Sequence, residues 1–358
     1  MLDRRQRTQM ARHCKDQLEQ EMIEKNYRIP SALEGYTVLL RNKYSAEDSQ
    51  YQSRGSVLFV HGATYGSTST FDYPVAGQSW MDHLAANHYD VWCLDLLGYG
   101  LSDRPSVMDQ PARDHAPIVD TAHAIVEVGH AVTFILEQRQ IPRLSLIGYS
   151  WGTAICGSYS AQYPNNVSKL VLSGALWLEG LPPTEALKDN LGAYRTVDVE
   201  SMMQRWAAGL TQHELDQIVS AQDRLKWCQQ TLACDPKSAE TGVLRAPTGV
   251  IEDYMRVRNS GEDWYDPGQI TASVLVVVGE LDEETTPAQG QQLFTRLTAA
   301  ATKELCVIGQ GTHSMLLERS RHRCIWSTVP RRRHAVVGRA SAWCRQMPVF
   351  KPGVFWVL

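Results

Sequence analysis

The residues that most clearly suggest catalytic chemistry form the sequence Gly148-Tyr149-Ser150-Trp151-Gly152. An apolar run that predicts a strand precedes it, and a stretch of small residues suited to a helix follows it. On a sharp turn between strand and helix a serine hydroxyl stands clear of the sheet, and glycine on both sides lets the backbone segments approach closely. We therefore predict that Ser150 is a nucleophile; the alternative is a glycine-rich turn with a structural serine.

A serine hydroxyl needs a base to act as a nucleophile at neutral pH, and the base needs a group that fixes its tautomer. Two turns further along the chain offer both groups. Asp282 follows an apolar run at 274–278, and His313 follows a second such run at 304–308. This order predicts that Asp282 orients His313 and that His313 activates Ser150.

The elements that must position these residues indicate an α/β fold. Short apolar runs at 56–60, 91–94, 144–147 and 170–172 each predict a strand, and helical stretches such as 121–138 separate them. Strands of continuous apolar character between helices are typical of a parallel sheet covered on both faces. We predict a mostly parallel central sheet flanked by helices, with a helical cap inserted after the sixth strand.

The predicted organisation has five parts. Residues 9–25 have the pattern of a polar helix, and the interval after the sixth strand is mostly helical in pattern, with aromatic residues along it. The parts are an N-terminal helical extension (1–30), the first part of the core (31–180), the cap (181–267), the second part of the core (268–318) and an atypical basic tail (319–358).

The tail differs from the rest of the chain in composition. It holds nine Lys and Arg residues and no Asp or Glu, and the helical period expected after His313 is lost within it. One interpretation is a basic arm that binds acidic partners. The other is a segment from a shifted reading frame or an unspliced intron, without a function of its own.

Composition narrows the range of partners. The 358 residues carry a net charge of −4, and no run of one sign crosses the main body, so we expect a small-molecule substrate and no nucleic acid. Eight cysteines without metal-ligand spacing indicate reduced thiols and no metal. The longest aliphatic run, 274–278, is far shorter than the roughly 20 residues of a membrane span. The charged N-terminus lacks a secretory pattern, which favours a cytoplasmic protein without membrane partners; the oligomeric state stays open.

Taken together, the motifs resemble those of the α/β-hydrolase superfamily over about residues 36–318. The similarity rests on five separate sequences: His61-Gly62, the segment from Asp95 to Asp103, the serine motif, Gly-x-x-Asp and Gly-x-x-His. The resemblance implies that Ser150 is the nucleophile, His313 the general base and Asp282 the orienting carboxylate, with no cofactor.

The resemblance also implies an oxyanion hole formed by the backbone amides of Ala63 and Trp151. We expect His61 to be a structural histidine that holds the loop beside this hole. In some relatives the acid follows the sixth strand, where Glu179 is the alternative to Asp282. The neighbouring residues Glu280, Glu283 and Glu284 are expected to be solvated loop charges.

Three residues are candidates for the substrate pocket, namely Tyr149, Trp177 and Glu179, although aromatic residues at such positions also serve as core. We expect a serine hydrolase that cleaves a small ester, thioester, lactone or amide through an acyl-enzyme. A tryptophan directly after the nucleophile resembles the prolyl iminopeptidase branch, so an aminopeptidase is one alternative. A non-hydrolytic binding protein, lyase or cyclase of the same fold is another.

Overall fold

A computed structural model describes residues 22–46, 54–178 and 191–328 of the chain. An eight-stranded sheet runs through its centre, in the order β1-β2-β4-β3-β5-β6-β9-β10. Pairing is antiparallel from β1 to β2 and from β2 to β4, and parallel for the other neighbours. The strands are β1 (Met22–Pro30), β2 (Thr37–Ser45), β3 (Ser56–Val60), β4 (Asp90–Asp95), β5 (Leu144–Tyr149), β6 (Val167–Ser173), β9 (Ser273–Gly279) and β10 (Lys303–Ile308).

The predicted α/β fold is confirmed. Every residue of β3, β4 and β5 is buried, as expected for strands whose two faces are both covered. Because β3, β5, β6, β9 and β10 run parallel, their carboxyl ends lie along one edge of the sheet, and the loops that follow them meet there. This edge is where the predicted site residues belong.

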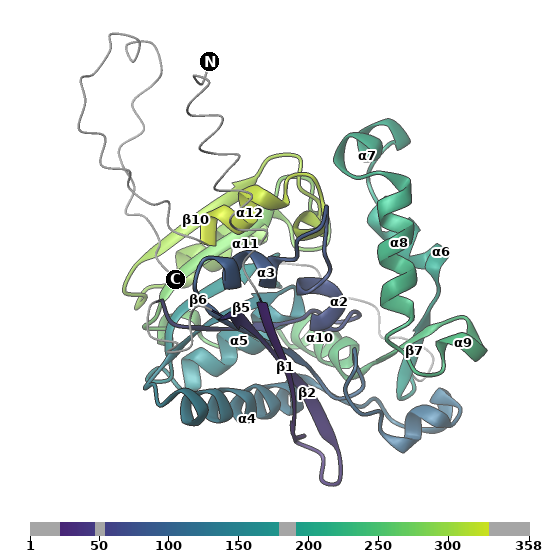
Figure 1. Cartoon of the computed structure of the whole chain (residues 1–358), viewed down its shortest axis with the longest axis horizontal. Helices are drawn as coiled ribbons and strands as arrows, with labels where there is room; N and C mark the ends of the chain where they lie inside the picture. Colours follow the sequence, from purple (N-terminus) through teal and green to yellow (C-terminus); the bar gives the residue numbers. More distant parts are fainter. Residues whose placement is uncertain (1–21, 47–53, 179–190, 329–358) are drawn as a thin grey trace.

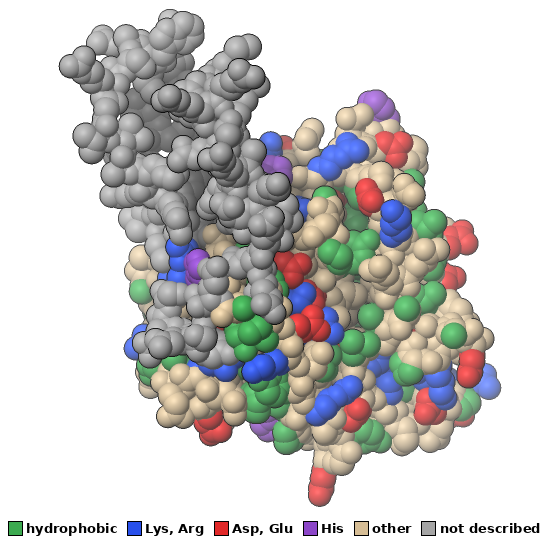
Figure 2. Space-filling view, in the orientation of Figure 1, with side chains coloured by type: hydrophobic (Ala, Val, Ile, Leu, Met, Phe, Trp, Pro, Cys, Tyr) green, Lys and Arg blue, Asp and Glu red, His purple; other side chains and the backbone are tan. Residues whose placement is uncertain are grey.

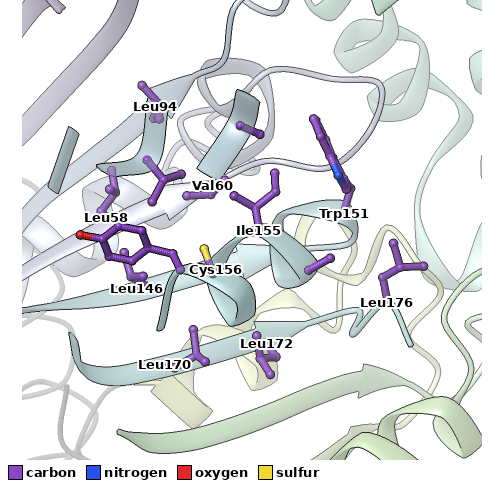
Figure 3. Close-up of a cluster of buried hydrophobic side chains, with 14 of the residues drawn as sticks. Leu58, Val60, Leu94, Leu146, Trp151, Ile155, Cys156, Leu170, Leu172 and Leu176 are labelled. Atoms are coloured by element: carbon purple, nitrogen blue, oxygen red, sulfur yellow. The ribbon is translucent and has the colours of Figure 1, made fainter. Parts of the chain in front are cut away.

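The sheet separates two hydrophobic cores. Leu58 and Val60 of β3 point into one core, and Val57 and Phe59 point into the other. The first core includes α4 and α5, which lie below the sheet in Figure 1, and Figure 3 shows side chains such as Ile155 packed within it. The second core includes side chains of α3 and α12. The helices of this layer structure are α2 (Ser67–Phe71), α3 (Trp80–Ala86), α4 (Thr121–Arg139), α5 (Trp151–Gln162), α11 (Pro287–Arg296) and α12 (Arg321–Thr328), with short 3₁₀ turns at Ser106–Asp109, Ala112–Asp114 and Met315–Leu317.

The described residues between β6 and β9 form a separate layer, which we call the cap. It holds five helices and a two-stranded antiparallel sheet, and α6 to α9 stand at the right of Figure 1. Its helix α10 returns to the main body, where it contacts α4. The cap elements are β7 (Tyr194–Val197), α6 (Val199–Trp206), α7 (Gln212–Ile218), α8 (Ala221–Leu232), α9 (Ser238–Thr241), β8 (Leu244–Pro247), α10 (Gly249–Ser260) and a 3₁₀ turn at Pro267–Gln269.

The N-terminal prediction was wrong where the structure describes it. Residues 22–30, expected within a helical extension, form the edge strand β1, which pairs with β2 from Met22 opposite Ser45 to Pro30 opposite Thr37. Polar residues of the expected helix face solvent on this edge, while Ile29 is buried in the core. A hairpin partner, rather than the local polar pattern, decides the conformation here. Residues 1–21 lie outside the described part.

The atypical tail predicted from residue 319 contains a helix at its start. Helix α12 covers Arg321–Thr328, and Ile325 is buried in the second core. A helix therefore does follow the histidine turn, although the local sequence lacked a clear helical period. Residues 329–358 lie outside the described part.

The distribution of surface charge and the character of the helices complete the description of the fold. Acidic and basic side chains are interspersed over the face seen in Figure 2. Of the helices in the described ranges, none combines the length and the apolar character that crossing a bilayer requires.

Candidate active site

Ser150 lies at the sharp turn that joins β5 to α5. Its backbone has φ 55° and ψ −122°, a conformation that costs a non-glycine residue about 1–3 kcal/mol. A Cβ on Gly148 would lie 2.3 Å from the Gly152 carbonyl oxygen, and one on Gly152 would lie 2.2 Å from the Val60 carbonyl oxygen. The two flanking glycines therefore permit a crossing that fixes Ser150 in its strained position.

The structure pairs His313 with Asp282. His313 Nδ1 lies 2.9 Å from Asp282 Oδ2, and both side chains are buried. Asp282 Oδ1 accepts the backbone N–H groups of Glu284 at 2.9 Å and Thr285 at 2.8 Å, and the Thr285 hydroxyl donates to Oδ2 at 2.8 Å. These bonds hold the carboxylate in one orientation, so Nδ1 of the imidazole carries its proton toward Asp282.

Two further contacts seat the imidazole. The Tyr149 ring stacks on it with centroids 5.1 Å apart, and the Tyr149 hydroxyl donates to the His313 carbonyl at 2.8 Å. Burial alone would lower the pKa of His313, but the charges of Asp282 and Glu284 outweigh it, and the pKa lies above its ordinary value. The ring is thus a base of increased strength, held in a fixed plane.

His61 fixes the loop after β3. Its Nε2 accepts the backbone N–H of Leu96 at 3.1 Å, so Nδ1 must carry the proton, which it donates to the Gly62 carbonyl at 2.7 Å. Burial lowers the pKa of His61, which keeps the ring neutral for this role. The Gly62 carbonyl and the Ala63 N–H belong to the same peptide plane, so His61 orients the predicted oxyanion donor.

The two predicted oxyanion amides lie beside Ser150. Ala63 follows Gly62, and a Cβ on Gly62 would approach Ser150 Cβ to 2.9 Å. Trp151 is the first residue of α5, where a backbone N–H has no acceptor within the helix. Its side chain is buried in the first core (Figure 3) and does not line the cavity described below. Both predicted donors therefore belong to residues beside Ser150, and their role as an oxyanion hole stays a prediction.

A cavity of about 50 Å³ brings these groups together. Gly62, Ala63, Tyr149, Ser150 and His313 lie on its core side. The cap and neighbouring loops supply the apolar and aromatic side chains of Tyr65, Met202, Trp206, Ala208, Trp227 and Leu281. They also supply polar and charged side chains, namely Thr64, Arg205, Glu283, Glu284, Thr312 and Ser314. The predicted serine, histidine and Tyr149 therefore share one cavity, with Asp282 buried behind the imidazole.

No hydrogen bond joins Ser150 Oγ to His313 Nε2 in the described part of the chain. Nε2 is buried and lacks any hydrogen-bond partner there. Contacts of this kind are often long before a substrate is bound and shorten in the reacting complex. The carboxylate oxygen Glu284 Oε2 lies 3.7 Å from Nε2.

Glu284 lies in a loop with its side chain 36% exposed, as expected, but it is not a free solvated charge. Its carboxylate forms a two-point ion pair with Arg205 of α6, in which Nε donates to Oε1 at 2.7 Å and Nη2 donates to Oε2. Burial alone would raise the pKa of Glu284, but His313 and Arg205 outweigh it and lower the pKa to about 2. Nothing in the local sequence indicates this pair, because its partners lie 79 positions apart.

Glu318 is a second site carboxyl that the sequence analysis missed. It is fully buried, accepts Trp206 Nε1 of the cap at 3.0 Å, and accepts the Thr312 N–H at 3.1 Å together with the Thr312 hydroxyl. Burial raises the pKa of Glu318. The Glu318 carboxylate thus links Thr312, the residue before His313, to Trp206 of the cap through hydrogen bonds.

Trp177, another predicted pocket residue, does not line the cavity. Trp177 is fully buried in the first core, where its ring packs edge-on against Tyr265 with centroids 5.7 Å apart. The prediction for Trp177 was wrong because an aromatic side chain after a buried strand fills the core beneath α11 and the cap. Glu179, the alternative acid and third pocket candidate, lies outside the described residues. Within the described ranges, no group of three or more His, Cys, Asp or Glu residues could hold a metal ion.

Comparison with known proteins agrees with this fold. The chain is 26% identical over 215 residues to a 2-hydroxy-6-oxononadienedioate/2-hydroxy-6-oxononatrienedioate hydrolase of Cupriavidus pinatubonensis, covering 55% of this chain and 68% of that protein. Among solved structures, the 2-hydroxy-6-oxo-6-phenylhexa-2,4-dienoate hydrolase of Rhodococcus sp. strain RHA1 aligns with a TM-score of 0.54 and 17% identity, over 85% of this chain and 96% of that one.

An esterase of Exiguobacterium antarcticum aligns with a TM-score of 0.54 and 18% identity, over 85% of this chain and 97% of that one. These similar proteins are hydrolases, and at such identities the solved structures support the fold alone. Residues 55–320 match the family described as alpha/beta hydrolase fold. The chain therefore belongs to the α/β hydrolase fold family.

Proposed function

We propose that the protein is a serine hydrolase that cleaves a small carbonyl substrate through an acyl-enzyme. One observation carries the proposal. Ser150, on a strained turn, shares a cavity with His313, and Nδ1 of His313 is hydrogen-bonded to the buried Asp282. This set supplies a nucleophile, a base and a group that fixes the tautomer of the base.

In the proposed reaction His313 Nε2 takes the proton of Ser150 as Oγ attacks the carbonyl carbon. The amides of Ala63 and Trp151 stabilise the negative charge that forms on the carbonyl oxygen. The protonated imidazole then gives its proton to the leaving group, and the bond between that group and the acyl carbon breaks. Water, activated by the same histidine, hydrolyses the acyl-enzyme and restores Ser150.

The cavity favours a small substrate with an apolar acyl or leaving group. Its wall includes the aromatic and aliphatic side chains of Tyr65, Met202, Trp206 and Trp227 beside the charged Arg205, Glu283 and Glu284, and its volume is about 50 Å³. Esters of short acids satisfy both conditions. The relative from Cupriavidus pinatubonensis acts, by its name, on dienedioates that carry a 6-oxo group, so ketones belong in the substrate screen as well.

The direct test compares hydrolysis of p-nitrophenyl acetate and butyrate by the unchanged protein and by Ser150→Ala. We expect the variant to lose at least a thousandfold in kcat/KM while keeping the same thermal unfolding midpoint. A fluorophosphonate should label Ser150 in the unchanged protein alone. Equal rates for the two proteins would remove the proposal.

The contacts of Glu284 argue against the aminopeptidase alternative. Binding a free amine requires a carboxylate available to it, and Glu284 is already paired with Arg205. Of the carboxylates that line the cavity, this leaves Glu283. We therefore expect p-nitrophenyl esters to be cleaved with a higher kcat/KM than L-proline p-nitroanilide.

A further inference from the structure

The ion pair between Arg205 and Glu284 connects the cap to the immediate surroundings of His313. Arg205 lies on α6, whereas Glu284 follows β9, two residues after Asp282. Glu284 Oε2 lies 3.7 Å from His313 Nε2, just beyond hydrogen-bond distance. The candidate base therefore has one carboxylate bonded at Nδ1 and a second close to Nε2.

His313 Nε2 is the atom for which two groups compete. To act as a base toward Ser150 it must face the serine hydroxyl, yet it is buried and has no hydrogen-bond partner in the described part of the chain. A free carboxylate in the place of Glu284 would form a charge-assisted bond with Nε2–H whenever the ring is protonated. That bond would hold the ring in its inactive, protonated form.

Arg205 opposes such a capture. Its guanidinium engages both oxygens of Glu284, and its Nη1 donates to the Thr64 hydroxyl at 3.0 Å. Arg205 also lies over the Tyr65 ring, 5.7 Å from its centroid. These contacts fix the guanidinium against the loop after β3, and a two-point pair fixes the plane of the carboxylate.

We propose that Arg205 is a positioning residue that acts through Glu284, holding this carboxylate away from His313 Nε2 so that the imidazole remains available to Ser150. This inference rests on the proposed function, because it concerns the same base. It also gives the cap a role in the reaction besides shaping the cavity.

The charges around the ring set the direction of the expected effects. Asp282 and Glu284 raise the pKa of His313, and Arg205 lowers it. Other titratable groups close by are Tyr149, which stacks on the ring, and Glu318, which is bonded to the adjacent Thr312. Tyr65 and Glu283 line the same cavity as His313. Removing the charge of Glu284 must lower the pKa of His313, and removing that of Arg205 must raise it.

The test uses the full chain with Glu284→Gln, Arg205→Met and the double variant, and it measures kcat/KM for p-nitrophenyl butyrate against pH. For one charge at this distance in a partly hydrated site we expect a shift of about one pH unit. Glu284→Gln moves the acid limb to lower pH, and Arg205→Met moves it to higher pH. At pH values below the acid limb of the unchanged protein, Arg205→Met therefore has about tenfold lower kcat/KM. The double variant recovers most of this loss.

Glu283→Gln is the matched control, since it removes the same charge from the neighbouring cavity residue, which has no ion pair with Arg205 or His313 among the described contacts. Its acid limb should shift by less than half as much as that of Glu284→Gln. Shifts of Glu284→Gln and Arg205→Met in the same direction, or a double variant no better than Arg205→Met, would overturn the inference.

A second measurement separates this inference from the proposed function. NMR titration of the labelled His313 ring, assigned with His313→Gln, reports its pKa without any substrate. Opposite shifts in the two single variants support the role of Arg205 even where every ester tested is left intact, in which case the proposed hydrolysis alone fails. Unchanged His313 titration in both variants refutes the inference, whatever the activity.

Discussion

Replacing Asp282 by asparagine tests how the carboxylate controls His313. The substitution keeps the size of the side chain and changes one acceptor atom into a donor. In the structure Oδ1 accepts two backbone N–H groups, from Glu284 and Thr285, whereas Oδ2 faces His313 Nδ1 at 2.9 Å. The asparagine must therefore keep its oxygen toward the two amides and turn its NH₂ group toward the imidazole.

That orientation reverses the tautomer of His313. An NH₂ donor opposite Nδ1 requires Nδ1 to be the acceptor, so the ring proton moves to Nε2, which can then no longer accept the proton of Ser150. In a serine protease with a Ser-His-Asp triad the same change lowers kcat by about 10⁴. We expect a loss of about 10³ to 10⁴ in kcat/KM, with the fold retained because the two backbone bonds to the side chain remain.

The assay measures kcat/KM for hydrolysis of p-nitrophenyl butyrate, and the thermal unfolding midpoint is measured on the same samples. Asp266→Asn serves as the control, because it makes the same chemical change at an exposed residue outside the cavity. A loss smaller than tenfold for Asp282→Asn in a folded protein would refute the assigned role. The triad acid would then have to be sought elsewhere.

Three further predictions concern the same site. His61→Ala leaves the Leu96 N–H and the Gly62 carbonyl buried without their partner, so the free energy of unfolding in urea should fall by about 2 kcal/mol and ester hydrolysis should slow at least tenfold; an unchanged rate would exclude a role in orienting the oxyanion loop. Gly62→Ala places a Cβ 2.9 Å from Ser150 Cβ and should reduce kcat more than it changes KM, and steady-state kinetics showing the opposite split would contradict this. The kcat/KM profile should fall toward acid pH as the His313 base is protonated, with an apparent pKa above the ordinary histidine value of about 6.5, because the two carboxylates beside the ring raise its pKa; an acid limb below that value would be inconsistent.

The strands that carry the site were predictable because each is a local apolar run. The run at 56–60 coincides with β3, and the run at 274–278 lies within β9. Both strands are almost wholly buried. Parallel pairing then forces the following loops to one edge, so the order of the motifs along the chain suffices to place Ser150 and His313 in one cavity. The glycines around Ser150 were informative for the same reason, since steric exclusion of a Cβ acts locally.

Features that depend on distant partners were not predictable. Strand β1 has the polar residues of a surface helix, and its conformation follows from pairing with β2. Trp177 could fill either a pocket or a core, and only the neighbouring Tyr265 decides between them. Glu284 resembles its acidic neighbours in sequence, and it differs from them through a guanidinium that the cap brings from position 205.

The cap is bonded to three of the loops that form the site, those after β3, β9 and β10. Arg195 of β7 donates to the Ala63 carbonyl at 2.8 Å, in the loop after β3. Arg205 pairs with Glu284 after β9, and Trp206 donates to Glu318, which holds the histidine loop after β10. Each of these hydrogen bonds ends on a group next to a predicted oxyanion donor or next to His313. We therefore expect a change in the cap to alter the positions of the proposed catalytic groups as well as the shape of the cavity. Substitutions in α6 should for this reason affect kcat as well as KM.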